Sequence, residues 1–589
     1  MSQLTNRVQG NTVLTYNFDD HINVFYRAGI DVFNTLAENF QNAGGVDSNV
    51  TGFLNTTNLL NEIYDHTLQV NGDYDFGPVG FTFNAAATTR LESSRLVGIA
   101  STGQSVFDVQ RHFVFENNDQ IEGRGTRNIA GIYGQITADY DNQVFLTVAG
   151  RNDWVSNLTQ ENRALFYPSA SASWLPTASI PSIKSDKWGL NYLKIRAGVG
   201  TSARFPDAGQ FPTSQTLAFA QQVFSDTSAD TGTSGVDIAA NAASNTLANP
   251  DLEPELQTEI EFGFESRFVD NRIRLDATYF DRNTRDLILT SPIPGSTGST
   301  TTTVNVGRIE GNGFEADLGI DIFRGKKFTW TSRVNFTTNE SIVTSLGTDV
   351  EQIIFGGNLA FGANVAREGF QLGSIVGSRI GRDENGNFLV GGDGSFLEEL
   401  ADEEGLAPII GDPNPDYIVN YINDFTWGNW NFGFQINHTQ GGDILSRTAS
   451  VLVGRGLTTD TLDRLNTFIL PGIDVGTGEP NNRQITNSDF FFDNLGFGPR
   501  ELQVFDATVI RLQQVSFGYS FPAKLLDTTP FGALSITASG QNLWFDAVNT
   551  PDGVNFDPNT VSGVGNGRGI DRITGPSGRR WGVAVRATF

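Results

Sequence analysis

The sequence predicts an all-β membrane protein, a transmembrane antiparallel β-barrel with long loops at one end and short turns at the other. Apolar and polar residues alternate with period two along most of the chain, as they do over residues 313–322. Every second connection between the alternating segments is short, and the others are mostly long. Short turns on one side and long loops on the other are typical of outer-membrane barrels. No run of about 18 apolar residues predicts a transmembrane helix.

The alternation predicts about 17 strands. Each has one apolar face for lipid and one polar face for the barrel interior. Their expected ranges are 11–18, 21–34, 63–76, 79–90, 127–140, 143–154, 164–175, 193–202, 255–268, 272–289, 303–323, 328–341, 416–426, 429–438, 507–521, 533–544 and 579–589.

The predicted connections fall into two sets. The periplasmic set consists of short turns such as Asp141-Asn142 and Trp427-Gly428, with two longer members at 176–192 and 522–532. The extracellular set consists of long loops at 35–62, 91–126, 203–254, 342–415, 439–506 and 545–578. Single-chain bacterial barrels have an even number of strands with both ends in the periplasm. An odd count therefore indicates either a missed or split strand or a chain truncated at its start, and truncation is the favoured interpretation.

Composition excludes several classes of function. The 39 Lys and Arg residues stand against 66 Asp and Glu, a net charge of −27, which disfavours nucleic acid as a partner. There is no cysteine, so no disulfide, thiolate or Cys-based metal chemistry is available. The four histidines are scattered, and we expect no cofactor and no metal site from them. No nucleophile–base–orienter set is recognisable, so we do not expect an enzyme.

The last predicted strand carries an apolar stripe that ends on an aromatic residue. Such a stripe resembles the signal that barrel-assembly machinery recognises, and its apolar face is expected to contact outer-membrane lipid. The residues of this predicted signal are Trp581, Val583, Val585, Ala587 and Phe589.

Two oxygen-rich segments have competing interpretations. Asp383 to Asn387 groups potential calcium ligands around Gly386, but the glutamate of an EF-hand is missing, and a turn is the favoured interpretation. Asp412 to Asp416, with its two prolines, is expected to be a rigid start to a strand. Gly198-Val199-Gly200 lies within a predicted strand, which argues against a phosphate loop.

Other polar and apolar groups receive structural interpretations first. Arg272, Arg274 and Asp276 are expected to line the barrel interior. The paired carboxylates Glu253/Glu255, Glu259/Glu261 and Glu398/Glu399 fit an acidic lumen or loop surface. Residues 457–470 could form a short helix, used for loop packing or, less readily, for partner contact. Its expected apolar side carries Leu457, Leu462, Leu465 and Phe468.

Several motifs together resemble those of the SusC/RagA-type TonB-dependent outer-membrane transporters. Their order and spacing match the barrel of that family over roughly residues 125–589. The matching segments run from Asn249 to Glu255, Arg274 to Ile288, Asn305 to Glu315, Gly411 to Tyr417, Ile510 to Pro522 and Ala538 to Leu543.

The resemblance implies an active importer of glycans or peptides that works with a SusD-like surface lipoprotein and with TonB. It also implies that residues 1–589 are part of a 22-stranded barrel, and that the signal peptide and the plug domain are absent from this chain. Which loop residues bind substrate does not follow from it. The alternatives are a barrel that serves as an adhesin or membrane-embedded hydrolase, and a soluble all-β binding protein.

Overall fold

Seventeen strands belong to a single sheet, and the strand pairs with a described register in it are all antiparallel. The computed structural model describes residues 2–45, 50–185, 189–206, 213–215, 217–225, 235–347, 351–551, 553–559 and 565–588. The chain divides into two compact units. Unit 1 comprises residues 1–173, 198–258 and 284–306, and unit 2 comprises residues 174–197, 259–283 and 307–589. Among the described residues, no helix has the length and apolar character needed to cross a bilayer.

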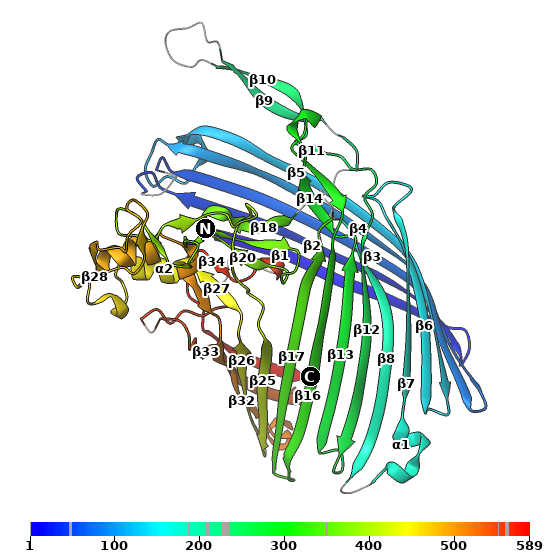
Figure 1. Ribbon diagram of the computed structural model, residues 1–589. Helices are drawn as coiled ribbons and strands as arrows, with labels where there is room; N and C mark the ends of the chain where they lie inside the picture. Colours follow the sequence, from blue (N-terminus) through cyan, green and yellow to red (C-terminus); the bar gives the residue numbers. More distant parts are fainter. Residues whose placement is uncertain are drawn as a thin grey trace. The chain divides into compact units, whose positions relative to one another are not determined.

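Successive hairpins build most of unit 1 (Figure 1). Each of the first five strands pairs with the next one along the chain. These strands and the two that follow them are β1 (Ser2–Asn17), β2 (Ile22–Gln41), β3 (Phe53–Phe76), β4 (Val79–Gln104), β5 (Phe115–Tyr140), β6 (Val144–Val155) and β7 (Ala164–Trp174).

The predicted long loops at 35–62 and 91–126 are wrong, because most of these residues extend the flanking strands. The connections shrink to residues 42–52 and 105–114, and pairing continues out to Gln41 and Phe53. At about 3.3 Å per residue, the 26 residues of β4 span about 86 Å. A membrane crossing needs only about ten. The outer parts of these hairpins therefore lie beyond the lipid, where both faces can be polar and the alternation that marks a strand is lost.

The tip of the β4–β5 hairpin has its own packing. Leu54, Val114 and Phe115 form a small buried cluster. His112 lies in the short 3₁₀ turn η1 (His112–Val114), with its ring nitrogens 2.8 Å from the Thr56 hydroxyl and 2.7 Å from that of Ser101. This histidine is therefore a structural residue of the tip.

The remaining strands of the sheet closely match the predicted ranges. Residues 255–268 form a strand at the predicted bounds, whereas the predicted strands 272–289 and 303–323 each divide into two shorter strands. Gly198-Val199-Gly200 lies inside β8, as expected. The strands are β8 (Leu190–Arg204), β12 (Glu255–Phe268), β13 (Ile273–Arg285), β16 (Arg308–Arg324), β17 (Phe328–Ser345), β25 (Tyr417–Trp427), β26 (Trp430–Gln440), β32 (Val509–Ser520), β33 (Ala533–Asp546) and β35 (Arg580–Thr588).

Aromatic residues gather at both ends of the unit 2 strands. Near the short turns, the Trp430 ring lies 5.0 Å from Phe517 and 4.5 Å from Tyr519. At the other end of β25, Tyr417 lies 5.7 Å from Phe336. Ten residues separate the two ends of this strand, or about 33 Å. A tilt of about 40° reduces that to about 25 Å, the height of the apolar band between the aromatic girdles of outer-membrane barrels.

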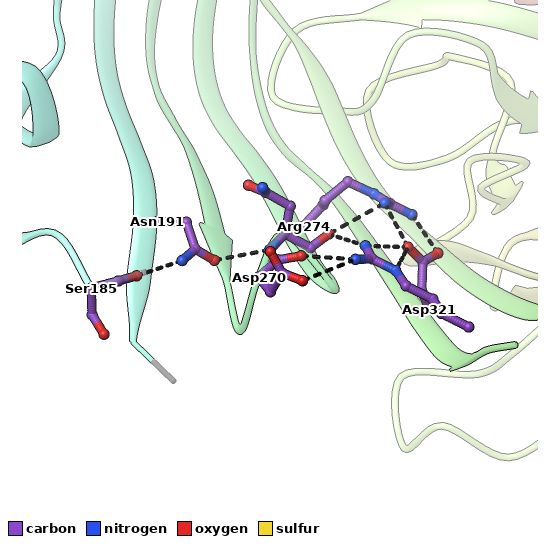
Figure 2. A network of polar contacts seen from close by, with 7 residues as sticks. Ser185, Asn191, Asp270, Arg274 and Asp321 are labelled. Atoms are coloured by element: carbon purple, nitrogen blue, oxygen red, sulfur yellow. Dashed lines mark hydrogen bonds and ion pairs between the residues drawn. The ribbon is translucent and has the colours of Figure 1, made fainter. Parts of the chain in front are cut away.

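The short-turn end of unit 2 is tied together by a polar network (Figure 2). Arg274 donates two hydrogen bonds, of 3.0 and 3.1 Å, to the Asp321 carboxylate, and Arg324 contacts the same carboxylate at 2.6 Å. Arg324 also donates to the backbone carbonyls of Asp270 and Asn271. The network continues through Asn191, whose side chain accepts from the Asn271 amide at 2.9 Å.

That network supports an unusual turn. Val269, Asp270 and Asn271 have φ values of 54°, 56° and 56°, a left-handed conformation that costs energy for any residue with a side chain and most for β-branched valine. The two hydrogen bonds from Arg324 offset part of that cost. Asp276 pairs with Arg196 at 2.6 Å, so this carboxylate lies on a polar face of the sheet; that Arg272, Arg274 and Asp276 line the barrel interior stays a prediction.

Short elements fill the long connections. Those between β8 and β16 are β9 (Leu217–Ser225), β10 (Gly235–Ala243), β11 (Thr246–Leu247), β14 (Ile288–Pro292) and β15 (Thr301–Asn305). After β17 come β18 (Gln352–Asn358), β19 (Gly362–Arg367), β20 (Ser374–Val376), β21 (Arg379–Ile380), β22 (Leu389–Val390), β23 (Glu398–Glu399) and β24 (Ile409–Gly411). After β26 come β27 (Asp443–Ser446), α2 (Arg447–Gly454), β28 (Thr467–Ile469), β29 (Ile473–Asp474), β30 (Gln484–Thr486), α3 (Asn487–Asp489), the π-helix η6 (Phe490–Gly496), η7 (Arg500–Gln503) and β31 (Val504–Asp506). The strand β34 (Ile570–Asp571) follows β33, and the helices α1 (Pro176–Ser179) and α4 (Ala523–Leu526) lie in the two longer connections on the short-turn side.

Candidate binding site in the loops of unit 2

Three long loops of unit 2 pack against one another at one end of its strands (Figure 1). Loop A comprises residues 346–416, loop B residues 441–508 and loop C residues 547–579. These ranges confirm the last three predicted long loops. The three loops together are called the loop module below.

Interlocking strands and a shared core hold the loop module together. In loop B, β27 pairs with β31 and also with β34 of loop C. Ile375, Leu445 and Ile570, one from each loop, form a cluster with at most 2% exposure. Because each loop contributes to the same core, the loop module presents a defined surface.

Gly569 allows the close approach of the three loops. Its φ is +78°, and a Cβ there would lie 2.3 Å from the Pro413 side chain and 3.1 Å from the Asp443 carbonyl. Only glycine fits such a contact. Loops A, B and C therefore meet at this residue.

A buried ion pair fixes loop C to the strands. The Arg511 and Asp557 side chains are 3% and 5% exposed and lie 2.9 Å apart. Arg511 also donates to the Asn437 side chain on β26 at 3.0 Å. A cavity of about 160 Å³ lies beside it, bordered by residues such as Pro413, Asp443 and Arg568.

The Asp443 carboxyl lines that cavity, and its pKa is raised. Burial and the nearby carboxylates of Asp412, Asp506 and Asp416 raise its pKa, and the Asp412 amide, which donates to it at 2.8 Å, offsets only part of that rise. The Asp412 to Asp416 segment therefore does more than begin β25: it forms one wall of the cavity. Within the described ranges, however, the structure groups no three acidic or histidine side chains into a site for a metal ion.

The N-terminus of helix α2 is capped by side chains from two loops. The Ser446 hydroxyl accepts from the Ala449 amide at 3.0 Å, and Asp571 of loop C accepts from Ser446 at 2.8 Å and from the Thr448 amide at 3.0 Å. Burial raises the pKa of Asp571, but the hydrogen bonds from Thr448, Thr574 and Ser446 outweigh burial, and the pKa lies below its ordinary value. The carboxylate also interacts favourably with the positive end of the helix.

Helix α2 packs closely on the π-helix η6. A Cβ on Gly454 would lie 2.8 Å from the Gly496 Cα, so the two backbones touch where both residues lack a side chain. Phe490, Phe491 and Phe492 begin η6, after a capping box between Thr486 and Asp489. This packing places Arg447 and Arg455, at the two ends of α2, beside phenylalanines at and just after η6.

Three arginines of loop B surround phenylalanine rings at this contact. The Arg447 guanidinium lies 4.8 Å from the centre of the Phe497 ring, and that of Arg455 lies 5.5 Å from both Phe492 and Phe497. Arg500 lies 5.8 Å from Phe361 of loop A. These distances are those of cation–π contacts. The three arginines and three phenylalanines are called the Arg–Phe cluster below.

The ionisation of the cluster reflects crowding of like charges. Burial lowers the pKa of Arg447, and the neighbouring Arg500 and Arg455 lower it further. Burial also lowers the pKa of Arg500, which only Glu398 raises. The cluster is thus a concentration of positive charge in a chain of net charge −27.

The sequence-based site predictions have mixed outcomes. Asp383 forms a turn, in which its carboxylate accepts from the Asn385 and Asn387 amides at 2.9 and 2.8 Å, so the turn interpretation is confirmed. Hydrogen bonds from Asn387 and Asn385 keep the pKa of Asp383 low. Glu255 is buried and accepts from the Ile288 amide, Glu259 pairs with Arg282, and Glu399 pairs with Arg379, all of them structural contacts.

The predicted helix at 457–470 is wrong. The segment contains only the 3₁₀ turn η5 (Thr459–Thr461) and strand β28. Leu457, Leu462 and Leu465 are 70%, 79% and 88% exposed, whereas Phe468 and Leu470 belong to a core cluster. Leucines spaced as on a helix do not by themselves secure one, because they need a surface to cover.

The apolar stripe of the last strand is exposed along β35. Trp581, Val583 and Val585 are 75%, 74% and 64% exposed, and Ala587 is half-buried. The last residue of the stripe, Phe589, lies outside the described residues.

Sequence reasoning missed the Arg–Phe cluster. Its members come from residues 361, 447–455 and 492–500, and only folding brings them together. The triple phenylalanine after the capping box at Thr486 is the local signal that could have located η6.

A long antiparallel sheet with aromatic residues at the strand ends and a packed loop module beside the unit 2 strands is typical of a membrane-spanning β-barrel protein. The family model described as "TonB dependent receptor-like, beta-barrel" matches residues 2–376. The chain belongs to this family of TonB-dependent receptors, whose members are outer-membrane proteins.

Curated relatives agree with the family. TonB-dependent receptor P3 of Formosa agariphila is 25% identical over 566 residues, covering 91% of this chain and 53% of that protein. TonB-dependent receptor P39 of the same organism is 23% identical over 627 residues, covering 91% and 55%. The chain thus spans about half the length of these relatives. They are receptors and not enzymes, as the sequence predicted.

Solved structures show the same fold. The structure described as the RagAB peptide transporter superposes with a TM-score of 0.71 at 15% identity, over 99% of this chain and 62% of that one. The RagAB peptide importer in its closed-closed state gives 0.69 at 14%, over the same shares.

Proposed function

We propose that this chain is the barrel of a TonB-dependent active importer of large nutrients, glycans or peptides, in the outer membrane. The observation that carries the proposal is the loop module, whose three loops share one buried core at one end of the unit 2 strands. A passive pore needs no such structure, whereas a receptor needs a defined surface to recognise its cargo.

The proposal includes partners. TonB would supply energy from the inner membrane, and a SusD-like surface lipoprotein would capture substrate together with the loops. The SusC/RagA-type motifs support both partners, and the fold shared with a structure described as a peptide transporter is compatible with them.

Residues 1–589 are proposed to be the barrel portion of a longer transporter, without its plug domain. The support is the coverage of about half of each curated relative, 53% for one and 55% for another. DNA sequence immediately upstream that encodes a plug and further strands in frame would agree with this proposal, and an in-frame stop codon there would contradict it.

The test is an in-frame deletion of the whole gene in its native host. Growth is then measured on a panel of glycans and peptides as sole nutrient, with a plasmid copy of the gene as the control. Loss of growth on one class, restored by the plasmid, is expected. Unchanged growth on the whole panel would contradict import and favour an adhesin or a membrane-embedded hydrolase.

A further inference from the structure

The guanidinium groups of the Arg–Phe cluster have no acidic partners. Within the part of the chain that the structure describes, neither Arg447, Arg455 nor Arg500 forms an ion pair. Three other arginines of the loop module do, as does Arg511 of β32 with a carboxylate of loop C, at 2.8 to 3.0 Å. These pairs are Arg367–Asp402, Arg379–Glu399, Arg382–Glu501 and Arg511–Asp557. Among the described residues, the cluster differs from the rest of the loop module because it brings three guanidinium groups without an ion pair together over phenylalanine rings.

One donor of the cluster is buried with nothing to bind. Arg500 is 9% exposed, and its Nη1 makes no hydrogen bond, although its Nε donates to the Ala360 carbonyl at 3.1 Å. Leaving a buried donor without a hydrogen bond costs about 1 to 3 kcal/mol of stability, and more when the donor belongs to a charged group. Such an orphan is expected where a ligand completes the site.

The rings orient the guanidinium groups. An arginine that lies over an aromatic ring keeps the N–H donors at the edge of its plane free for an oxyanion. Arg455 has the clearest form of this arrangement: its side chain is exposed, and its described contacts are the Phe492 and Phe497 rings alone. Arg447 uses one N–H on the Gly496 carbonyl at 2.6 Å and keeps its other donors.

We infer that the Arg–Phe cluster is a binding site for an oxyanion group, a carboxylate or a sulfate, carried by the imported molecule. Three guanidinium groups supply the positive charge, and the unpaired N–H of Arg500 would donate a directional hydrogen bond to the oxyanion. The inference rests on the proposed import function, and it narrows the cargo to acidic glycans or peptides. The three neighbouring guanidinium groups repel one another, and a bound oxyanion would offset that repulsion.

Binding is measured by calorimetry on the full gene product in detergent micelles. The probes are oligogalacturonate for carboxylate, sulfated carrageenan oligosaccharide for sulfate, maltooligosaccharide of equal length as the neutral reference, and sodium acetate and sodium sulfate alone. We expect one of the two acidic oligosaccharides to bind at least about tenfold more tightly than the neutral one, the value of one charge-assisted hydrogen bond. The preferred probe identifies the oxyanion.

The variant Arg455→Gln is expected to weaken that binding about tenfold, and Arg455→Lys less. Arg382→Gln is the matched control, because Arg382 also lies on a phenylalanine, 5.3 Å from Phe388, but is paired with Glu501. It should leave binding unchanged. Heat-modifiable migration in gels confirms that each variant is folded.

Three results would overturn the inference: equal binding of acidic and neutral probes, equal loss in Arg455→Gln and Arg382→Gln, or inorganic sulfate binding as tightly as the oligosaccharide. Failure of the import function looks different. In that case the acidic probe still binds through Arg455, but deletion of the gene changes growth on no substrate.

Discussion

Replacing Arg511 by methionine should release loop C from the strands. The change leaves the Asp557 carboxylate buried at 5% exposure without its cation, and it removes the 3.0 Å hydrogen bond to Asn437. Removing one partner of a buried pair costs about 3 to 5 kcal/mol. Local opening of loop C should therefore become more frequent by a factor of about 150 to 5,000.

Hydrogen exchange of residues 547–579 in the micelle-bound protein measures that opening. Arg382→Met is the control, because its pair with Glu501 is about one-third exposed on each side and such pairs contribute about 0 to 1 kcal/mol. The double change Arg511→Met with Asp557→Leu should regain much of the loss, since no unpaired charge is left. Unchanged exchange of loop C in Arg511→Met would refute the role given to this pair.

Three further changes test other parts of the structure. Gly454→Val should separate α2 from η6 at Gly496 and destabilise the loop module by about 1 to 3 kcal/mol, seen as faster proteolysis of loop B, with no change expected if the contact is loose. The pKa of Asp571 is lower in the folded state, so its stabilisation is present above the unfolded value of about 3.9 and is lost as pH falls through the folded pKa. Asp571→Asn should therefore lower the melting temperature at pH 7 more than at pH 3, and an equal effect would argue against this ionisation. Val583→Asp should cost about 2 kcal/mol at a lipid-facing position and reduce the amount in the outer membrane, whereas Ala584→Asp on the other face should not.

The strands could be predicted because a membrane sheet has one apolar and one polar face, so apolar and polar residues alternate along each strand. Residues 255–268 form β12 at the predicted bounds, since every second side chain there meets either lipid or the polar interior. The same rule failed for residues 35–62 and 91–126, where both faces meet water and only backbone pairing marks the strand.

The candidate site could not be predicted, because its contacts are long-range. Arg455 and Phe361 are separated by almost a hundred residues, and no local period connects them. The leucines at 457–465 led to the opposite error: their helical spacing predicted a helix, but they are exposed and pack against no surface that would stabilise one. The two glycines that bring α2 onto η6 are recognisable only after the contact is known.

Import itself is tested most directly by uptake of a labelled substrate. The oligosaccharide that binds the Arg–Phe cluster is tagged with a fluorophore and given to cells with and without the intact gene, in the presence and absence of a protonophore. The account predicts accumulation only in energised cells that carry the gene. Equal accumulation in the cells that lack the gene would contradict it.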